Sequence, residues 1–425
     1  MSSRAGVVLG LLVLSLAGAL ISGREMFFDL AYLWGGLLIV SFVWSRTALS
    51  GVKLERHPRT LRAQVGHSFE ERFSLQNRGR VPKVWVEIED GSNLPGHRAS
   101  AVTVGLGAHH ERTWVVRTVC VRRGGYRLGP AKLAGGDPFG LFPMSRPVPA
   151  THQVVVMPLT VPLSSFVLPA GQRPGGEALR HRAHQVTPSA AGVRDYAPGD
   201  GFNRIHWAST ARRDRLIVKE FELDPKADIW IFIDASRKVQ AGSAEATPAH
   251  FPSWTAPRQV RLPPVTVEYG VAAAASITLH LLQQDRAVGL VAYGRSRQVS
   301  QPDRGERQLY RLLESLAVLE AEGWMSLEEV LKIETPQIPR GASVVLVTPA
   351  VSPGILTSAR QLDRRGLMPV LVFLDAQSFG GPSGSQAIAA TAQKAGFTVR
   401  LIACDDDLAA ALSSPRLSPV LLSAA

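Results

Sequence analysis

A chain of 425 residues is long enough for two or three domains, each with a hydrophobic core of its own. Its two cysteines, Cys120 and Cys404, lie too far apart in the sequence for a disulfide framework, and no metal-binding spacing surrounds them. The formal net charge is +12, and the segment 46–146 holds 17 Lys and Arg residues against 8 Asp and Glu residues. Such a basic surface is suited to nucleic acid, anionic lipid or an acidic protein.

Two apolar segments at the start of the chain are long enough to cross a bilayer. Residues 5–23 carry no charge, and residues 26–45 carry only Asp29, near one end. Together they predict a transmembrane hairpin over residues 1–48. A cleaved signal peptide is the alternative for the first segment, because Ala17-Gly18-Ala19 resembles a cleavage site, but the second segment would still stop transfer.

The charges that flank these segments predict their orientation. Arg4 precedes the first segment and five basic residues from Arg46 to Arg62 follow the second, whereas the connection holds only Arg24 and Glu25. By the positive-inside rule we expect a multi-pass protein of the cytoplasmic membrane with both termini in the cytoplasm. Lipid is then the simplest partner for the basic segment, and its strand-like aromatic spacing argues against nucleic acid.

Residues 50–160 alternate between apolar and polar side chains, which is typical of strands with one buried face. Turns rich in Gly and Asn separate the strands, so we expect a β-sandwich-like domain of about a hundred residues. The clearest expected strands are 68–77, 83–90, 100–106 and 111–121. Residues 161–190 show no periodicity and are interpreted as a linker.

After a polar region at 191–226, short apolar strands alternate with helices through 227–425. This alternation predicts a parallel sheet with helices on both faces. The expected strands are 229–234, 287–292, 343–348, 369–374 and 397–402. The expected helices are 265–284, 305–321, 354–365, 385–395 and a short one from 406. The proline-rich segment 238–264 interrupts the first connection and is expected to be a loop of unknown role.

Three motifs occur in order along the chain. The first is Arg122-Arg123-Gly124-Gly125-Tyr126-Arg127-Leu128-Gly129-Pro130, and the second is Asp137-Pro138-Phe139-Gly140-Leu141-Phe142. The third is a signature of Arg194, Tyr196, Pro198, Gly199, Asp200, Arg204, Ile205, Trp207, Ala211 and Arg212. All three resemble motifs of the bacterial family called domain of unknown function 58. Asn203 departs from the pattern, because the family has the first of two adjacent arginines there.

This resemblance implies an architecture and a partner. Members of the family combine two membrane helices, a β-rich region and a von Willebrand factor A-like α/β domain. They are often linked with MoxR-type AAA ATPases, so the resemblance implies such an ATPase as the partner. The chain has no Walker A sequence, which fits an adaptor rather than the motor.

Two interpretations of the signature stay open. In the first, ion pairs between its arginines and Asp200 lock the β-region onto the α/β domain; in the second, the arginines form a docking surface for carboxylates or phosphates. If the segment is extended, Ile205 and Trp207 would be buried while His206 faces away. Catalysis is not expected, because Ser209 and Thr210 have no neighbouring base except His206. The candidate docking residues are Gly192, Arg194, Tyr196, Pro198, Gly199, Asp200, Arg204, Trp207 and Arg212.

A degenerate metal site is expected at the end of the strand 229–234. Von Willebrand factor A-like domains often bind Mg²⁺ there through Asp-x-Ser-x-Ser, and Asp234 and Ser236 match the first two positions. Lys238 replaces the second Ser, and no Asp follows the strand 343–348. We therefore expect no cofactor, with Mg²⁺ as the weaker alternative, and Asp234 paired with Arg237 or Lys238.

The function predicted from these features is that of a membrane-anchored cytoplasmic adaptor without enzymatic activity. As a scaffold, it would present its α/β domain for protein interaction and work with the ATPase in the assembly or maturation of partner proteins. Phe139, Leu141 and Phe142 are expected to pack in a domain seam, with Asp137 capping a turn. The alternatives are an envelope-related hydrolase with an unrecognised site and a protein that binds nucleic acid or anionic lipid.

Overall fold

The computed structural model describes residues 3–169, 190–196, 205–213, 215–221, 227–243 and 261–413, and every structural statement below concerns these residues. The chain forms two compact units. The first comprises Met1–Val161, Ala241–Ser276 and Tyr310–Glu320, and the second comprises Pro162–Gln240, Ile277–Leu309 and Ala321–Ala425. The domain boundaries expected from the sequence stay predictions, and most of the expected linker 161–190 lies outside the described residues.

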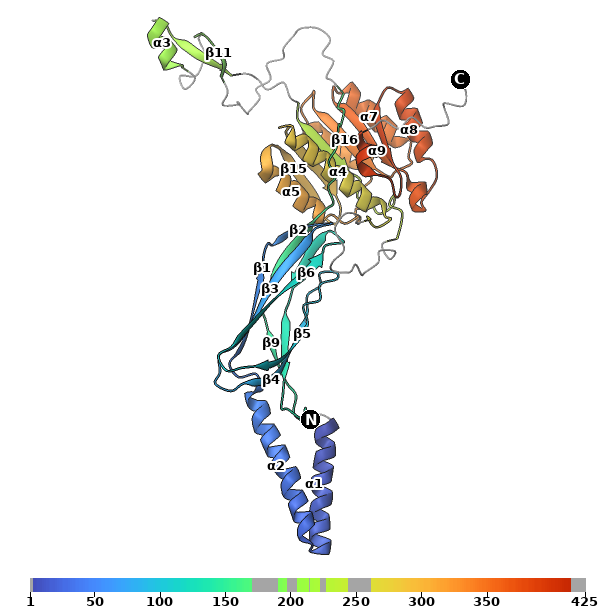
Figure 1. Cartoon of the computed structure of the whole chain (residues 1–425). Coiled ribbons are helices and arrows are strands. Elements are labelled where there is room, and N and C mark those ends of the chain that lie inside the picture. The colour runs from blue at the N-terminus through green and yellow to red at the C-terminus, as the bar shows by residue number, and fades with distance from the viewer. Residues whose placement is uncertain are drawn as a thin grey trace. The chain divides into compact units, whose positions relative to one another are not determined.

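Two long apolar helices open the first unit (Figure 1): α1 (Ser3–Ser22) and α2 (Glu25–Ala48). By length and composition both can cross a membrane. Gly23, with φ of 63°, ends α1 in the left-handed conformation that glycine adopts without strain, and its N–H bonds to the carbonyl of Ala19. The ring of Phe27 packs against Gly18, where a Cβ atom would lie only 2.9 Å from the ring.

The rest of the first unit is rich in antiparallel strands. One sheet has the order β1-β3-β6, a second β5-β4-β8-β9 and a third β2-β10-β7. Their bounds are β1 (Val52–Pro58), β2 (Arg62–Gln64), β3 (Ser68–Asn77), β4 (Lys83–Asp90), β5 (Ala101–Leu106), β6 (Glu111–Val119), β7 (Gly124–Leu128), β8 (Ala131–Gly135), β9 (Met144–Val148) and β10 (His152–Met157). The four strands expected from alternation are confirmed, three of them with the same or nearly the same bounds.

Alternation along β3 explains how these sheets form a core. Phe69, Phe73 and Leu75 point inward and are at most 2% exposed, because side chains two apart share one face of a strand. Phe73 and Leu75 pack with side chains of β4 and β8, whereas Phe69 belongs to a second cluster with residues of β7 and β10. The same inward face also carries a charged residue, Glu71.

The second unit contains a six-stranded sheet of order β15-β14-β13-β16-β17-β18. Its strands are β13 (Ile229–Ile233), β14 (Val288–Tyr293), β15 (Arg297–Asp303), β16 (Ser343–Thr348), β17 (Met368–Leu374) and β18 (Thr398–Ile402). Five strands are parallel, but β15 is antiparallel to β14, so the sheet is mixed. The expectation of a purely parallel sheet was wrong at this edge, because a three-residue turn after β14 returns the chain as a hairpin.

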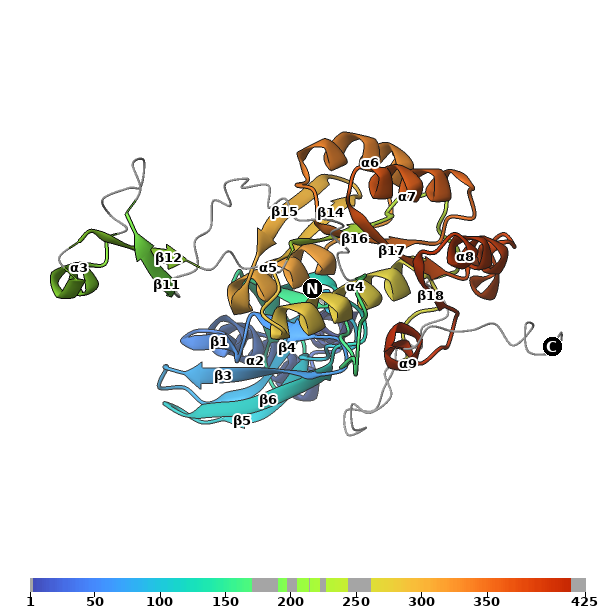
Figure 2. The ribbon, with the colours of Figure 1, turned by 90° about the horizontal axis from the view of Figure 1, so that it is seen from above.

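Helices alternate with these strands, as the sequence predicted. They are α4 (Thr266–Gln283), α5 (Gly305–Ala317), α6 (Leu327–Glu334), α7 (Gly354–Arg364), α8 (Ser385–Lys394) and α9 (Leu408–Ser413). Figure 2 shows α6 and α7 over one face of the sheet. There Leu327, Ile355 and Leu362 pack on Phe232 and Leu346. Helix α6 was not among the helices predicted from the sequence. It begins with a capping box formed by its N-cap Ser326 and Glu329.

A small antiparallel hairpin precedes this sheet in the chain. It consists of β11 (Ala190–Asp195) and β12 (Ile217–Phe221), and a short helix, α3 (Trp207–Arg213), lies between them in the sequence. The register pairs Arg194 with Val218 and Asp195 with Ile217. The hairpin therefore brings the two ends of the signature region side by side.

Candidate functional site

The structure describes only part of the predicted docking signature. Pro198, Gly199, Asp200 and Arg204 lie outside the described residues, and for Gly192 and Arg194 only the backbone is described, in β11. The predicted ion pairs of Asp200 therefore stay a prediction. Tyr196, Trp207 and Arg212 are described, and the N–H of Tyr196 bonds to the carbonyl of Leu216 at 2.9 Å.

The end of the signature is helical rather than extended. Ile205 is buried at 4% exposure, as expected, and forms a bridge with Val218. Trp207 begins α3 and is 66% exposed, so the expectation that it is buried was wrong. The cause is the change in period, since a helix does not place residues 205 and 207 on one side as a strand does. Arg212 and Arg213, at the other end of α3, are exposed as well.

His206 and Ser209 contact each other at the start of α3. His206 Nδ1 lies 2.8 Å from Ser209 Oγ and accepts the backbone N–H of Ser209 at 3.2 Å. A side chain that accepts an N–H three residues ahead caps a helix. The pair thus has a local structural explanation, and it gives no support to the hydrolase alternative.

The carboxyl edge of the six-stranded sheet is the second candidate site. The chain runs from β13 to β14 on one side and later adds β16 on the other side of β13, so the ends of β13 and β16 form a topological switch point. Ligands of open α/β sheets bind outside the carboxyl ends of strands at such a point. Asp234 directly follows β13, and Thr348 is the last residue of β16.

Asp234 is bound to neutral donors at this edge. Its Oδ2 accepts the hydroxyl of Thr348 at 2.7 Å, and its Oδ1 accepts the N–H of Ser236 at 3.1 Å. The hydroxyl of Thr348 in turn accepts the N–H of Ala350 at 3.0 Å. Within the described residues Asp234 forms no ion pair with Arg237 or Lys238, so that expectation was wrong; Arg237 instead lies over the ring of Trp324.

Burial shapes the acidity of this carboxyl group. Asp234 is 4% exposed, and burial raises its pKa to about 6, although the hydrogen bonds from Thr348 and Ser236 oppose the rise. The carboxylate of Glu328 raises the pKa further. Asp234 is therefore easier to protonate than an exposed aspartate.

These residues do not fit the Mg²⁺ site that the resemblance implied. Magnesium requires a nearly octahedral oxygen shell that includes carboxylates. Here both oxygens of Asp234 already accept protein donors, and neutral Thr348 ends the strand after which an aspartate was expected. Among the residues that the structure describes, no group of three or more His, Cys, Asp or Glu side chains could hold a metal ion. We call this edge of the sheet closed, because the hydrogen bond from Thr348 occupies the carboxylate of Asp234.

An exposed tryptophan adjoins this closed edge. The backbone of Gly323 exchanges two hydrogen bonds of 2.9 Å with the segment after β13, one from Arg237 N–H and one to the carbonyl of Ala235. Only glycine fits at 323, because a Cβ atom would lie 2.1 Å from the carbonyl oxygen of Tyr293. Trp324 follows and is 77% exposed, with the guanidinium of Arg237 5.2 Å from its ring centroid. No pattern in the sequence marks Trp324 as a candidate site residue.

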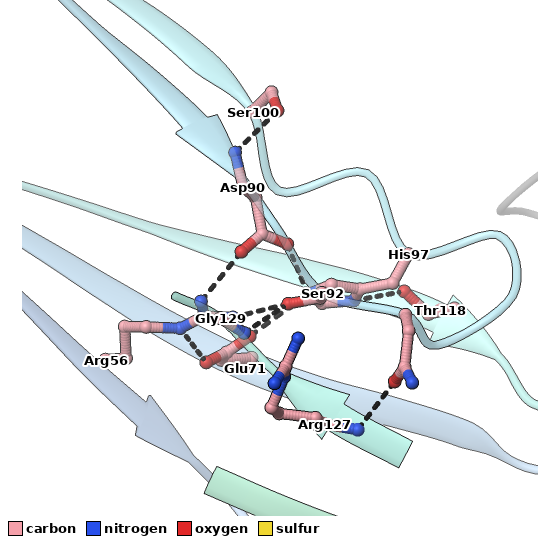
Figure 3. Close-up of polar contacts among 10 residues, drawn as sticks. Arg56, Glu71, Asp90, Ser92, His97, Ser100, Thr118, Arg127 and Gly129 are labelled. Carbon is pink, nitrogen blue, oxygen red and sulfur yellow. Dashed lines mark hydrogen bonds and ion pairs between the residues drawn. The ribbon is translucent and has the colours of Figure 1, made fainter. Parts of the chain in front are cut away.

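A buried polar cluster in the β-region was also missed (Figure 3). Arg56 donates two hydrogen bonds to Glu71, at 2.8 and 3.0 Å, and one to Asp90 at 2.7 Å. His97 Nε2 lies 3.0 Å from Glu71 Oε2. None of the four side chains is more than 3% exposed. Arg56 also donates one hydrogen bond to Ser92 Oγ at 3.0 Å, and that oxygen accepts the N–H of Gly129 at 2.8 Å.

The alternation of inward and outward residues along β1 and β4 could have predicted this cluster. Arg56 shares the inward face of β1 with Val52 and Leu54, and Asp90 shares that of β4 with Val86 and Ile88. A charged residue at an inward position on several strands indicates a buried ion network, because an unpaired buried charge is too costly. The cluster also connects to the first motif through Gly129, where a Cβ atom would lie 2.8 Å from Arg56 Nη1.

The first motif has a further structural role through Arg123. This side chain donates hydrogen bonds to the carbonyls of Leu316 at 3.1 Å and Leu319 at 2.7 Å, and it forms an ion pair with Glu268. All of these residues belong to the first unit. Tyr126 donates its hydroxyl hydrogen toward the carbonyls of Arg122 and Arg123. The motif therefore connects the β-region to Glu268 and to residues 316–319, which are distant from it in the sequence.

The second motif forms a turn around a buried aspartate. Asp137 is fully buried and accepts the N–H groups of Phe139, Leu141 and Phe142 at 2.7–3.2 Å, which confirms its expected capping. Leu141 is buried, but Phe139 is 55% exposed, so its expected packing was wrong. The N–H groups of residues 139, 141 and 142 point inward to the carboxylate of Asp137. In the turn that they form, the side chain of Phe139 is left exposed.

Solved structures resemble the chain only in part. A CARDB domain of the PF1109 protein from Pyrococcus furiosus is 16% identical, covers 25% of this chain and 91% of its own, and gives a TM-score of 0.20. A beta-glucosidase from Listeria innocua is 11% identical, covers 25% of this chain and 16% of its own, and gives a TM-score of 0.16. At these scores neither likeness carries an inference about function.

Sequence comparison is more specific. The uncharacterized protein YeaD of Bacillus subtilis (strain 168) is 24% identical over 200 residues, which are 47% of this chain and 43% of YeaD. The chain therefore spans less than half the length of this relative. Residues 192–252 match the model of a family described as protein of unknown function DUF58. Residues 192–252, which hold the third motif, therefore match the family that the sequence pattern indicated, and the resemblance is confirmed over this segment.

Proposed function

We propose that the protein is a membrane-anchored cytoplasmic adaptor whose α/β unit, a von Willebrand factor A-like domain, docks a protein partner. The β-region, as a β-sandwich, would carry this domain at the membrane. In line with the family resemblance, the proposed partner is a MoxR-type AAA ATPase. The observation that carries the proposal is the closed carboxyl edge beside the exposed Trp324.

Anchoring is supported by the two apolar helices and by the charges at their ends. Arg4 lies in the first turn of α1 and Arg46 in the last turn of α2, so both basic ends of the hairpin fall on one side. The connection on the other side holds one basic residue, Arg24. The positive-inside rule then favours an inside position for the ends that carry Arg4 and Arg46.

Docking is supported by the composition of the edge. Tryptophan and arginine are the residues enriched at the energetic centres of protein interfaces. Trp324 and Arg237 present both types together, in a cation–π contact of 5.2 Å. The hydrogen bond between Asp234 and Thr348 supports a binding surface without a metal ion, since it occupies the carboxylate locally.

Binding by the full chain in lipid nanodiscs to a purified MoxR-type ATPase tests this proposal. The expected result is that Trp324→Ala weakens binding at least about thirtyfold, because a buried interface tryptophan contributes about 2 kcal/mol or more. The matched control is Ile333→Ala, which removes another exposed apolar side chain, from α6. Unchanged affinity in Trp324→Ala, or an equal loss in both variants, would refute docking at this edge.

A second comparison separates the two surfaces that could dock the partner. Trp207→Ala removes the exposed tryptophan of the signature hairpin, whereas Trp324→Ala removes that of the sheet edge. We expect only Trp324→Ala to weaken ATPase binding. A loss confined to Trp207→Ala would move the docking surface to the signature.

A further inference from the structure

The turn of the second motif lies beside the ends of the two apolar helices. The ring of Phe142 packs edge-on against Phe42 of α2, with centroids 5.7 Å apart. Trp85 of β4 donates its indole N–H toward the carbonyl of Asp137 at 3.4 Å. The guanidinium of Arg4 in α1 lies next to Gly140, where a Cβ atom would be 3.1 Å from Nη1. The turn is thus placed at the level where α1 begins and α2 ends.

A second loop lies at the same level. Lys83 of β4 donates a hydrogen bond to the carbonyl of Thr47 in the last turn of α2, at 2.6 Å. Arg78 N–H bonds to the carbonyl of Gly51, just after α2, at 2.8 Å. The loop between β3 and β4 therefore also adjoins the helix end, and it exposes Arg78, Arg80 and Val81.

Together these side chains make a basic rim with apolar tips. We define the membrane-proximal rim as Arg4, Arg46, Arg78, Arg80, Val81 and Phe139. Phe139 and Val81 are 55% and 42% exposed, and the four arginines are exposed. The segments 49–51, 78–83 and 136–144 contain one acidic residue, Asp137, whose carboxylate is fully buried and bound to three N–H groups. The rim therefore presents positive charge without exposed acidic neighbours from these segments.

The turn is built to hold Phe139 outward. Three hydrogen bonds to Asp137 fix the backbone from residue 139 to residue 142, and the buried Leu141 anchors it from below. The turn therefore presents the Phe139 ring to the phase that adjoins the ends of α1 and α2. At the boundary of a bilayer, aromatic side chains are favoured at headgroup depth.

We propose that the membrane-proximal rim binds the anionic headgroups of the leaflet in which α1 begins and α2 ends, with Phe139 inserted into the interface. The inference rests on the proposed membrane anchoring and extends it. The rim's arginines would contact lipid phosphates, and the attraction is confined to about a Debye length from the surface. The β-region would then be fixed against the membrane at two loops besides the helices themselves.

Spin labelling of the full chain in nanodiscs tests the inference. Cys404→Ser removes one native thiol, and burial raises the pKa of the Cys120 thiol to about 12, so Cys120 does not react with the label at neutral pH. Single labels are placed by Phe139→Cys, Leu61→Cys and Leu14→Cys. Leu61 is 51% exposed and lies beyond the end of β1 that is remote from α2, so it is the control for an exposed apolar site away from the rim. Leu14 is 69% exposed in the middle of α1.

In nanodiscs of phosphatidylcholine and phosphatidylglycerol, we expect the label at 139 to lose accessibility to a water-soluble nickel relaxant and to gain accessibility to oxygen. The label at 61 should stay accessible to nickel. Nickel accessibility at 139 equal to that at 61, with the label at 14 in lipid, would overturn the inference while leaving anchoring intact. If the label at 14 were also accessible to nickel, anchoring itself would fail.

The charge requirement is tested in the same system. Replacing phosphatidylglycerol with phosphatidylcholine should reduce the nickel shielding at 139, and so should the double variant Arg78→Gln/Arg80→Gln. The matched double variant Arg72→Gln/Arg98→Gln, which changes two exposed arginines outside the rim, should keep the shielding. Shielding that is independent of both phosphatidylglycerol and Arg78 and Arg80 would overturn the assignment to anionic headgroups.

Discussion

The neighbouring residues Glu70 and Glu71 of β3 allow a sharp test of the buried polar cluster. They are chemically identical but point to opposite faces of the strand. Glu71 is fully buried and binds Arg56 through two hydrogen bonds, with His97 3.0 Å away. Glu70 pairs on the other face with Arg59 and Arg117, which are 77% and 67% exposed. Glu71→Gln and Glu70→Gln therefore make the same change in two environments.

The expected cost of Glu71→Gln follows from the burial of Arg56. Removing one partner of a buried ion pair costs about 3–5 kcal/mol, because the other charge is left uncompensated. Asp90 still pairs with Arg56 at 2.7 Å, so we expect the low end, about 3 kcal/mol. Glu70→Gln should have no measurable effect, since exposed pairs are screened by water.

Hydrogen exchange on the full chain measures this cost locally. Amides of β3 and β6 that exchange through opening of the β-region should exchange about a hundredfold faster in Glu71→Gln, since 1.4 kcal/mol is a factor of ten. Exchange in β13 and β16 of the second unit serves as the internal reference. Unchanged protection in Glu71→Gln, or equal effects of both substitutions, would refute the assignment of a stabilising role to the buried network.

The acidity of Glu71 gives the same test a pH dependence. Burial alone would raise its pKa, but hydrogen bonds from His97 and Arg56 outweigh burial and hold the pKa below its ordinary value. A carboxyl group with a lowered pKa in the folded state stabilises above its unfolded pKa, and this stability is lost as the pH falls through the folded pKa. The advantage of the wild type over Glu71→Gln should therefore be constant near pH 7 and shrink in acid.

Three further predictions concern single side chains. Because the pKa of Asp234 is raised from 3.8 to about 6, the ionised side chain lowers the free energy of unfolding by up to about 3 kcal/mol above pH 6. Asp234→Asn removes this charge, so it should slow hydrogen exchange in β13 at pH 7.5. At pH 3.5, where Asp234 is protonated, it should have no such effect. Thr348→Val should destabilise the second unit by about 1–3 kcal/mol, because it leaves Asp234 and the N–H of Ala350 without their partner. Thr348→Ser keeps the hydroxyl group and should not destabilise it. Equal midpoints of urea unfolding for these two variants would contradict the prediction. Asp137→Ala should cost about 1–3 kcal/mol and expose the amides of residues 139–142 to exchange, and full protection in this variant would rule out the capping.

Periodicity was sufficient to predict most regular elements, and local pattern explains why. Strands such as β3 and β16 bury one or both faces, so their sequences repeat with a period of two or run continuously apolar. The edge strand β15 was missed because its sequence RQVSQPD is polar and contains a proline, which only an unpaired edge tolerates. Helix α6 was missed because its eight residues are short for a periodicity signal.

The candidate sites were harder to predict, because they depend on contacts between distant segments. Asp234 was found from its motif, but its partner Thr348 lies 114 residues away and is brought close only by the parallel pairing of β13 and β16. Trp324 gave no signal in the sequence, since its position depends on the bridge between Gly323 and Ser236. Phe139 was expected to pack because it is apolar, and only the turn geometry shows that it points outward.

Membrane topology tests the central claim most directly, because an ATP-dependent partner requires the α/β unit to be in the cytoplasm. Arg24→Cys and Lys394→Cys, each in the Cys404→Ser background, place exposed thiols in the helix connection and in α8. A membrane-impermeant maleimide should label residue 24 in intact spheroplasts and residue 394 only in inverted vesicles, and the protein should stay with the membrane in alkaline carbonate. Labelling of residue 394 in intact spheroplasts, or release of the protein by carbonate, would contradict a membrane-anchored cytoplasmic adaptor.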